Sequence, residues 1–316
     1  MTTPAVPPTP ARVSFAHRAE YAAFRAVIAS LGALDWRRAG NIGARIGALG
    51  YRPLGIRRLV VERQIAAAFP GLGKAGVTKI ARAAYEHLGR SSIEAATLPS
   101  LGRDAVFEAF EGVDDYHVIE NALNKGRGLI LATGHLGNWE LGGIYLAARG
   151  LPIDVIVRRM NNPLFDRYLT KTRSRFGIQV VHDAEAVRRT PRALREGRAV
   201  VFLADQGVLG LASTFVPFFG RPAKTPRGPA VFALRLNIPV VFGAAIRQPS
   251  GKYRIVLESV EVEDTGDRDR DVDAIVARYT ATLERWVRRY PEQYFWHHRR
   301  WRRQPPGTPP ELLEPS

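Results

Sequence analysis

Short apolar runs alternate with helical patterns from about residue 115 onward. The runs are rich in Val, Ile and Leu, and they cover residues 129–133, 153–157, 178–181, 199–203 and 239–245. Residues 254–260 add a run in which apolar and polar positions alternate, which is typical of an edge strand. Because helical segments separate most of these runs, the pattern predicts an α/β fold with a largely parallel central sheet flanked by helices.

The first hundred residues have helical spacing instead. Apolar side chains recur every three or four positions at Tyr21, Phe24, Ile28, Leu31 and Leu34. Further helices are expected over about 56–68 and 75–96. Apolar stripes interleaved with arginines and a tryptophan are typical of an interfacial helix on an anionic membrane, but a helical hairpin packed on the main domain would show the same stripe.

These patterns divide the chain into four segments. We expect residues 1–12 to be disordered, 13–100 to form a helical, membrane-associated region, 101–303 to form the α/β core in one domain with those helices, and 304–316 to be a disordered tail. No apolar run approaches the roughly 20 residues that span a bilayer. The sequence therefore predicts peripheral or monotopic attachment.

Charge and cysteine content narrow the chemistry. The formal net charge is +16, and only six of the 46 cationic residues are lysines. Such a charge predicts an anionic partner, and arginine suits bidentate contact with phosphate or carboxylate. The absence of cysteine excludes disulfides, thiolate metal sites and a cysteine nucleophile.

The segment from His135 to Glu140 follows the first apolar run. His135 is expected in the turn between strand and helix, and Glu140 in the first helical turn, where the helix dipole favours a carboxylate. A histidine held by a carboxylate is a candidate general base. In the simpler alternative, His135 only ends a strand and Glu140 only satisfies a helix start.

Polar side chains also follow the other strands. Arg158 and Arg159 follow the second run, Asp205 and Gln206 the fourth, and Arg247 the fifth. In a parallel sheet they would gather at one carboxyl edge. This set suits direct transfer, in which His135 deprotonates a hydroxyl that then attacks an activated carbonyl. Glu140 would fix the imidazole, and the amides near Gly137 and Asn138 would stabilise the oxyanion. The arginines would hold an anionic group.

Five ordered blocks carry a resemblance to a known family. They are His135 with Glu140; Arg159 with Asn162-Pro163; Asp205-Gln206; Pro217-Phe218-Phe219-Gly220 with Ala223, Thr225 and Gly228; and the segment from Pro291 to Trp301. Together they resemble the bacterial lipid A biosynthesis (lauroyl/myristoyl) acyltransferases and the related phosphatidylinositol mannoside acyltransferases. The resemblance extends from about Tyr21 to Arg303.

The resemblance implies an O-acyltransferase with a glycerolipid acyltransferase-like fold. It would act at the cytoplasmic face of the bacterial inner membrane and move a fatty acyl group from acyl carrier protein or coenzyme A to a hydroxyl of a membrane glycolipid such as a lipid A precursor. His135 would be the base, Glu140 its partner and Asp205 a second acid. Substrate contacts are expected from Asn138, Arg158, Arg159, Gln206, Thr225 and Arg247. No metal and no cofactor beyond the acyl donor is expected.

Two further expectations and two alternatives accompany this interpretation. The acyl chain is expected in a groove lined by Val216, Phe218 and Phe219. The aromatic and basic residues after Pro291 could stack on nucleic acid or sit at a membrane interface, and the resemblance favours the membrane, with no nucleic acid partner. The alternative functions are a lysophospholipid or other glycolipid acyltransferase, and a non-catalytic basic protein that binds membranes or nucleic acid.

Overall fold

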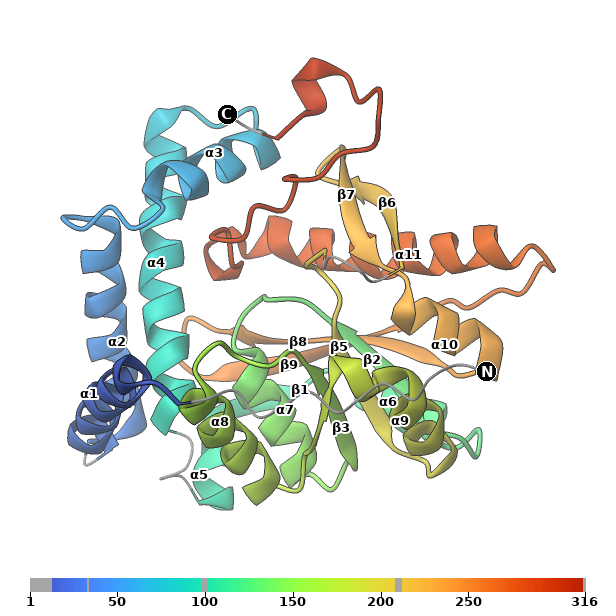
Figure 1. Ribbon diagram of the computed structural model, residues 1–316, viewed down its shortest axis with the longest axis horizontal. Coiled ribbons are helices and arrows are strands. Elements are labelled where there is room, and N and C mark those ends of the chain that lie inside the picture. Colours follow the sequence, from blue (N-terminus) through green and yellow to red (C-terminus); the bar gives the residue numbers. More distant parts are fainter. Residues whose placement is uncertain (1–12, 33, 98–101, 208–211, 315–316) are drawn as a thin grey trace.

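The computed structural model describes residues 13–32, 34–97, 102–207 and 212–314, and its centre is a seven-stranded sheet with strand order β1-β9-β8-β2-β5-β3-β4 (Figure 1). The strands of this sheet are β1 (Phe110–Val113), β2 (Leu129–Thr133), β3 (Ile153–Val157), β4 (Gln179–His182), β5 (Ala199–Leu203), β8 (Val240–Arg247) and β9 (Tyr253–Val260). A separate antiparallel hairpin joins β6 (Ser213–Phe218) to β7 (Arg221–Pro226).

The sheet confirms the predicted α/β class and its largely parallel pairing. Strands β2, β3, β4, β5 and β8 run parallel, so their carboxyl ends share one edge. The prediction that 254–260 is an edge strand is wrong: β9 pairs antiparallel with β8 on one side and parallel with β1 on the other. The outer strand there is β1, which is too short and too polar to give a strand signal in the sequence.

The helices pack on both faces of the sheet. They are α1 (Phe15–Gly32), α2 (Trp36–Tyr51), α3 (Arg58–Ala68), α4 (Lys74–Thr97), α5 (Arg103–Glu108), α6 (His117–Leu123), α7 (Trp139–Ala148), α8 (Pro163–Arg175), α9 (Asp183–Arg195), α10 (Gly228–Leu236) and α11 (Arg268–Arg289). Successive side chains of a strand point to opposite faces of the sheet. Ile130 and Ala132 of β2 join the core formed with α10 and α11, whereas Leu129 and Leu131 join the core formed with α6 and α7.

The N-terminal helices pack on the core through α4. Side chains of α3 and α4, such as Val61 and Ala81, belong to the same buried cluster as the sheet. Glycines let α2 approach α4 closely, because a Cβ at Gly47 or Gly89 would overlap backbone atoms of the other helix. The predicted helices over 56–68 and 75–96 are confirmed as α3 and α4. The predicted stripe lies on α1 and packs in part, as the hairpin alternative required, because Ile28 and Leu31 are buried.

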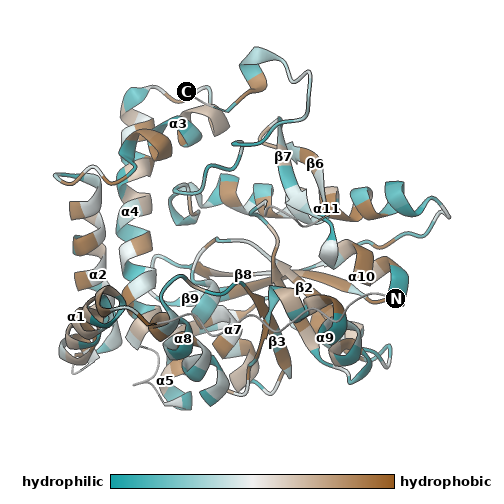
Figure 2. Cartoon of the chain, in the orientation of Figure 1, coloured by the Kyte–Doolittle hydropathy of each residue, from teal (hydrophilic) through white to brown (hydrophobic). Residues whose placement is uncertain are grey.

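One surface of this helical region is nevertheless apolar. Figure 2 shows brown, apolar residues along α2. Large side chains are exposed where α2 turns into α3; these are Ile46, Leu49, Leu54, Ile56 and Leu59. No helix within the described residues is both long and apolar enough to cross a bilayer.

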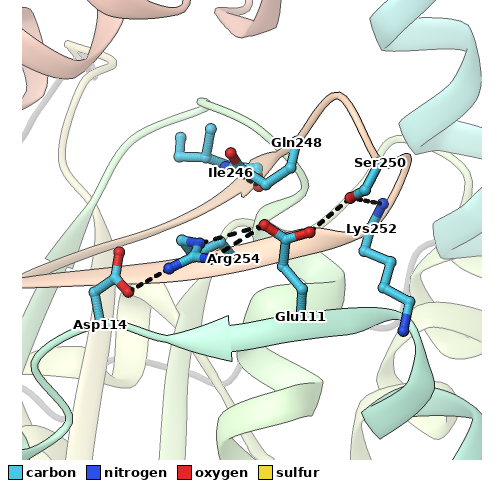
Figure 3. Close-up of polar contacts among 7 residues, drawn as sticks. All are labelled: Glu111, Asp114, Ile246, Gln248, Ser250, Lys252 and Arg254. Atoms are coloured by element: carbon cyan, nitrogen blue, oxygen red, sulfur yellow. Dashed lines mark hydrogen bonds and ion pairs between the residues drawn. The ribbon is translucent and has the colours of Figure 1, made fainter.

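Charged side chains fix the outer strand β1 to its neighbour (Figure 3). Arg254 of β9 donates to Asp114 at 2.8 Å and to Glu111 of β1 at 3.2 Å, and the Ser250 hydroxyl donates to Glu111 at 2.6 Å. Charges on an outer strand also disfavour pairing with another chain. This edge is opposite to β4 in the strand order.

Most aromatic side chains of the C-terminal segment are buried, contrary to both interpretations of this segment, although Arg299 and Arg302 are exposed. Trp296 and Trp301 are 1% and 0% exposed, and the Trp301 indole donates to the carbonyl of Phe218. Side chains packed in the core can neither stack on nucleic acid nor lie at a membrane interface. Of the predicted disordered segments, 1–12 lies outside the described residues, while 304–314 is ordered: Arg221 donates to the carbonyl of Leu313, and Arg299 pairs with Glu314.

Candidate active site

His135 and Asp205 meet at the carboxyl edge of the sheet. They follow β2 and β5, which are hydrogen-bonded neighbours, so the two turns leave the sheet side by side. The His135 Nδ1 lies 2.7 Å from Asp205 Oδ1, and the His135 backbone N–H donates to Asp205 Oδ2 at 2.9 Å. A carboxylate only accepts, so Nδ1 carries the proton and Nε2 is the basic nitrogen.

The surroundings of Asp205 keep it ionised. Burial alone would raise the pKa of this carboxyl, but the charge and hydrogen bonds of His135, with a smaller contribution from Arg300, hold the pKa well below its usual range. Asp205 is 3% exposed. A buried carboxylate behind an imidazole fixes its tautomer and stabilises the imidazolium form.

Aromatic rings and one amide frame the imidazole. The ring centroids of Trp139 and Phe295 lie 4.9 and 5.9 Å from that of His135. The backbone N–H of Phe295 donates to the His135 carbonyl at 2.9 Å, and the Gln206 side-chain nitrogen lies 3.2 Å from His135 Nδ1. The structure therefore places Gln206 next to the predicted base.

Glu140 is paired differently from the prediction. Its two carboxylate oxygens accept from Arg173 of α8, with Nε at 3.0 Å and Nη2 at 2.5 Å. The carboxylate on the imidazole is Asp205, so the expected contact of Glu140 with His135 is corrected. The reason is topological: Glu140 lies on the first turn of α7, beside α8, whereas Asp205 emerges from the strand adjacent to β2.

The expected oxyanion site at Gly137 and Asn138 is also wrong. The Gly137 N–H donates to the carbonyl of Gln293 and the Asn138 N–H to that of Ala245, both at 3.0 Å. Gly137 has φ +65°, and a Cβ there would overlap the Ala245 carbonyl oxygen. These amides hold the catalytic turn against β8 and the C-terminal segment, and are not directed at a substrate.

Two predicted substrate contacts are internal. Asn138 is 1% exposed; its side chain caps α7 by accepting from Leu141 N–H and donates to Glu94. Thr225 is fully buried and accepts from Arg300 at 2.6 Å. A small polar residue in a motif can cap a helix, as Asn138 does, or accept from a buried arginine, as Thr225 does, instead of binding a ligand. This explains why both predicted substrate contacts are wrong.

The three predicted arginines do not gather at one point, because Arg247 lies apart from Arg158 and Arg159. Arg158 lines the cavity that contains His135, and Arg159 is exposed beside it. Arg247 lies farther along the edge, where its backbone exchanges two hydrogen bonds with the Gln293 side chain. Because β8 is separated from β3 by β2 and β5, the residues after these strands do not converge.

A cavity of about 690 Å³ opens at His135. Its polar side chains include His135, Glu140, Arg158, Arg173, Gln206 and His298. Most of its wall is apolar, with contributions from Gly143, Ile153, Val155, Ile178, Val187, Val201, Phe202, Val231 and Phe232. The groove predicted at Val216, Phe218 and Phe219 is wrong, because these residues are buried in the core.

The sequence is similar to known proteins over most of its length. Residues 12–303 match the family described as bacterial lipid A biosynthesis acyltransferase. The chain belongs to this family. It is 26% identical to the lipid A biosynthesis lauroyltransferase of Escherichia coli K12 over 271 residues, which cover 85% of this chain and 87% of that protein.

Other relatives extend the similarity. The lipid A biosynthesis palmitoleoyltransferase of the same strain is 26% identical over 84% of this chain and 85% of its own length. A phosphatidylinositol mannoside acyltransferase of Mycolicibacterium smegmatis is 28% identical over 48% of this chain and 51% of its own length. The predicted family resemblance is thus confirmed, and the protein is an acyltransferase.

Several residues around the site of this lipid A acyltransferase family member escaped the sequence analysis. Glu94 of α4, 2% exposed, accepts from Asn138 and from the Tyr253 hydroxyl, and His87 Nε2 lies 3.1 Å from the Gly137 carbonyl. Burial raises the pKa of Glu94 despite these hydrogen bonds. The sequence signal for Glu94 was only a carboxylate on the apolar face of a predicted helix, which does not indicate a site. Tertiary packing alone brings α4 to the catalytic turn.

Three partly or fully buried histidines should make the stability of this acyltransferase pH-dependent. Burial lowers the pKa of His87, His297 and His298 to about 4 each, from about 6.5 when unfolded. As the pH falls from 6.5 to 4, the unfolded chain takes up protons that the folded protein does not. The free energy of unfolding should therefore fall through this window, by on the order of 3 kcal/mol per histidine, and should change little from this cause above pH 7.

Urea unfolding at constant ionic strength between pH 7.5 and 4.5 measures this dependence. The His87→Gln variant, which removes one of the three groups, should show a shallower fall than the wild type. Equal midpoints at pH 7 and pH 4.5 in the wild type would contradict the assignment of neutral buried imidazoles.

Proposed function

We propose that this acyltransferase moves a fatty acyl group from a thioester to a hydroxyl of a lipid A precursor or a closely related membrane glycolipid. The observation that carries the proposal is the pairing of His135 with Asp205, with His135 in the lining of a cavity whose wall is mostly apolar. An imidazole with a fixed tautomer supplies the base, and an apolar cavity suits an acyl chain. The names of the relatives support the class of acceptor.

The transfer follows from the position of the imidazole. His135 Nε2 takes the proton of the acceptor hydroxyl as its oxygen attacks the thioester carbonyl. The tetrahedral intermediate then collapses, the new ester remains on the lipid, and the thiolate leaves and receives the proton from the imidazolium. Asp205 stabilises the imidazolium throughout. The donor is acyl carrier protein or coenzyme A carrying the acyl group, and the reaction needs no metal and no further cofactor.

Glu140 acts through Arg173 in this proposal. Both side chains line the cavity, and the bidentate pair fixes the guanidinium near the predicted base. Arg158 lies in the same lining. These guanidinium groups, with that of Arg235 in the same lining, suit anionic groups of a substrate.

We propose peripheral attachment at the cytoplasmic face of the inner membrane, and the apolar turn between α2 and α3 supports the attachment itself. Leu54, Ile56 and Leu59 are each more than half exposed, and Arg52 and Arg57 stand between and beside them. Exposed apolar side chains interleaved with cations suit the headgroup region of an anionic bilayer.

Acyl transfer with labelled donors tests the proposed function. Purified protein is offered acyl carrier protein or coenzyme A thioesters together with a lipid A precursor, a phosphatidylinositol mannoside or a lysophospholipid. The expected result is a new acylated lipid A precursor that forms from at least one donor. Acylation of the lysophospholipid alone would replace the proposed acceptor, and no lipid product from folded, lipid-bound protein would reject the transfer.

Gly143 offers a test of the acyl cavity. This residue lines the cavity from α7, and a Cβ there meets only the end of Ile178 at 3.9 Å. Gly143→Leu should shift the preference to shorter chains, with about tenfold lower activity on the longest good donor. The reason is that each methylene kept out of the cavity forfeits about 0.8 kcal/mol of burial, so two methylenes account for a factor of about ten.

Gly143→Ala is the matched control. It adds one methyl at ordinary contact distance and improves helix propensity by up to about 1 kcal/mol. It should retain the wild-type chain preference. An unchanged chain-length profile in folded Gly143→Leu protein would remove this cavity as the acyl site.

A further inference from the structure

A second cavity, of about 1010 Å³, lies between α1, α4 and α8. Figure 1 shows α1 and α8 side by side at one end of the molecule. Four cationic side chains line the cavity, namely Arg25, Arg167, Lys171 and Arg175. None of the described residues in its lining is acidic, so the charged side chains of the lining are all positive.

The acidic residues next to this cavity have other contacts. Glu20 of α1 accepts from the Asn162 side chain at 3.0 Å, and Asp166 of α8 accepts from the Met160 N–H at 3.2 Å. The side chains of Arg167 and Lys171 are exposed. They are therefore accessible to an anion from solution or from a membrane.

Aromatic packing holds the two helices that frame the cavity. Phe24 of α1 lies edge-on to Phe165 and Tyr168 of α8, with ring centroids 4.9 and 5.4 Å apart. Arg25 lies over the Tyr168 ring at 5.6 Å. A framework of packed rings places the cations before a ligand arrives, which lowers the entropy lost on binding.

The chemistry of the lining selects a phosphate group. Arginine forms bidentate pairs with phosphate oxygens, and lysine contributes a point charge to the same group. The hydroxyl of Ser174 lies in the same lining, and Ile28 and Ala96 supply apolar surface beside the charges. A ligand with one anionic and one apolar end fits this lining.

Exposed apolar side chains on or next to the framing helices α1 and α8 favour a lipid as the ligand. On α1, the helix that carries Arg25, Phe15 is 86% exposed and Val27 is 46% exposed, and Met160 just before α8 is 44% exposed. Exposed apolar side chains beside clustered cations are typical of contact with an anionic membrane surface. We propose that the cavity between α1, α4 and α8 binds the phosphate of a lipid headgroup.

This site is separate from the catalytic cavity but shares a helix with it. Arg173 of α8 lines the catalytic cavity, whereas Arg167, Lys171 and Arg175 of the same helix line the basic one. A lipid phosphate held here would fix the position of α8 relative to the membrane. The inference concerns binding alone and does not depend on the proposed acyl transfer.

Vesicle binding tests the proposal. Phosphatidylcholine vesicles are doped either with phosphatidate or with oleate at equal measured surface charge, and the wild-type protein is titrated with each. A built phosphate site predicts tighter binding to the phosphatidate vesicles at equal charge. The Arg167→Gln/Lys171→Gln variant should lose about thirtyfold in affinity for phosphatidate vesicles and lose the preference over oleate.

Arg268→Gln/Arg270→Gln is the matched control. Both residues are exposed near the start of α11, on the opposite side of the molecule from α1, and the change in net charge is identical (Figure 1). This variant should keep the preference for phosphatidate. Glycerol 3-phosphate in solution, added at millimolar concentration, should compete only weakly, because it lacks the apolar chains.

Three results would overturn the proposal. One is equal wild-type affinity for the two vesicle types, and another is a preference that survives in Arg167→Gln/Lys171→Gln protein. The third is complete competition by glycerol 3-phosphate, which would assign the site to a soluble phosphate. Circular dichroism and thermal melting of each variant establish that it is folded; the substituted side chains are exposed, so we expect wild-type curves.

Discussion

Replacement of His135 by alanine should lower acyl transfer by about 10²- to 10⁴-fold without unfolding the protein. His135 supplies the nitrogen that accepts the hydroxyl proton, and its Nδ1 is already committed to Asp205 at 2.7 Å. The remaining rate would come from positioning of the donor and acceptor. Initial rates with saturating donor and acceptor measure the effect.

His117→Ala is the control for this substitution. The His117 side chain is 64% exposed, lies beside Asp115 and is not in the lining of the cavity that contains His135. It should retain wild-type rates, which would show that loss of a histidine alone is harmless. If His135→Ala protein kept more than a tenth of the wild-type rate, the general-base role would have to be abandoned.

Asp205→Asn should reduce kcat by about 10³- to 10⁴-fold and change KM little. An amide cannot accept from both Nδ1–H and the backbone N–H as the two carboxylate oxygens do, and it carries no charge to stabilise the imidazolium. The residue lies behind the imidazole and is 3% exposed, so substrate does not contact it. The effect therefore belongs to kcat.

Glu140→Gln is the informative comparison, because the sequence analysis predicted Glu140 to hold the imidazole. Its carboxylate instead pairs with Arg173, and its loss should release that guanidinium in the substrate cavity. We expect a loss of about 10- to 100-fold, mostly in KM. If Glu140→Gln lowered kcat as much as Asp205→Asn while KM stayed constant, Glu140 would be the direct partner of the base in the reacting complex.

Hydrophobic periodicity was sufficient for the sheet and for most helices. Strands over 129–133, 153–157 and 199–203 have the predicted bounds, because each is a short, mostly apolar run with no fully exposed residue. Strand β1 gave no such signal, since Phe110 is its only fully buried residue and its Glu111 carboxylate pairs with Arg254 of β9. The β6–β7 hairpin was missed because its apolar residues are interrupted by proline and face a core built by distant segments.

The sequence by itself determined the α/β class, the family and the placement of His135 and Asp205 at the carboxyl edge of the sheet. These features follow from local periodicity and from residues that stand directly after strands, so short stretches of sequence are enough to predict them. Tertiary structure alone decided which carboxylate holds the imidazole, that Asn138 and Thr225 are buried, and that the C-terminal aromatic residues belong to the core. Each of these depends on contacts between segments up to hundreds of residues apart. Strand order and helix packing bring those segments together, and no local pattern in the sequence specifies either of them.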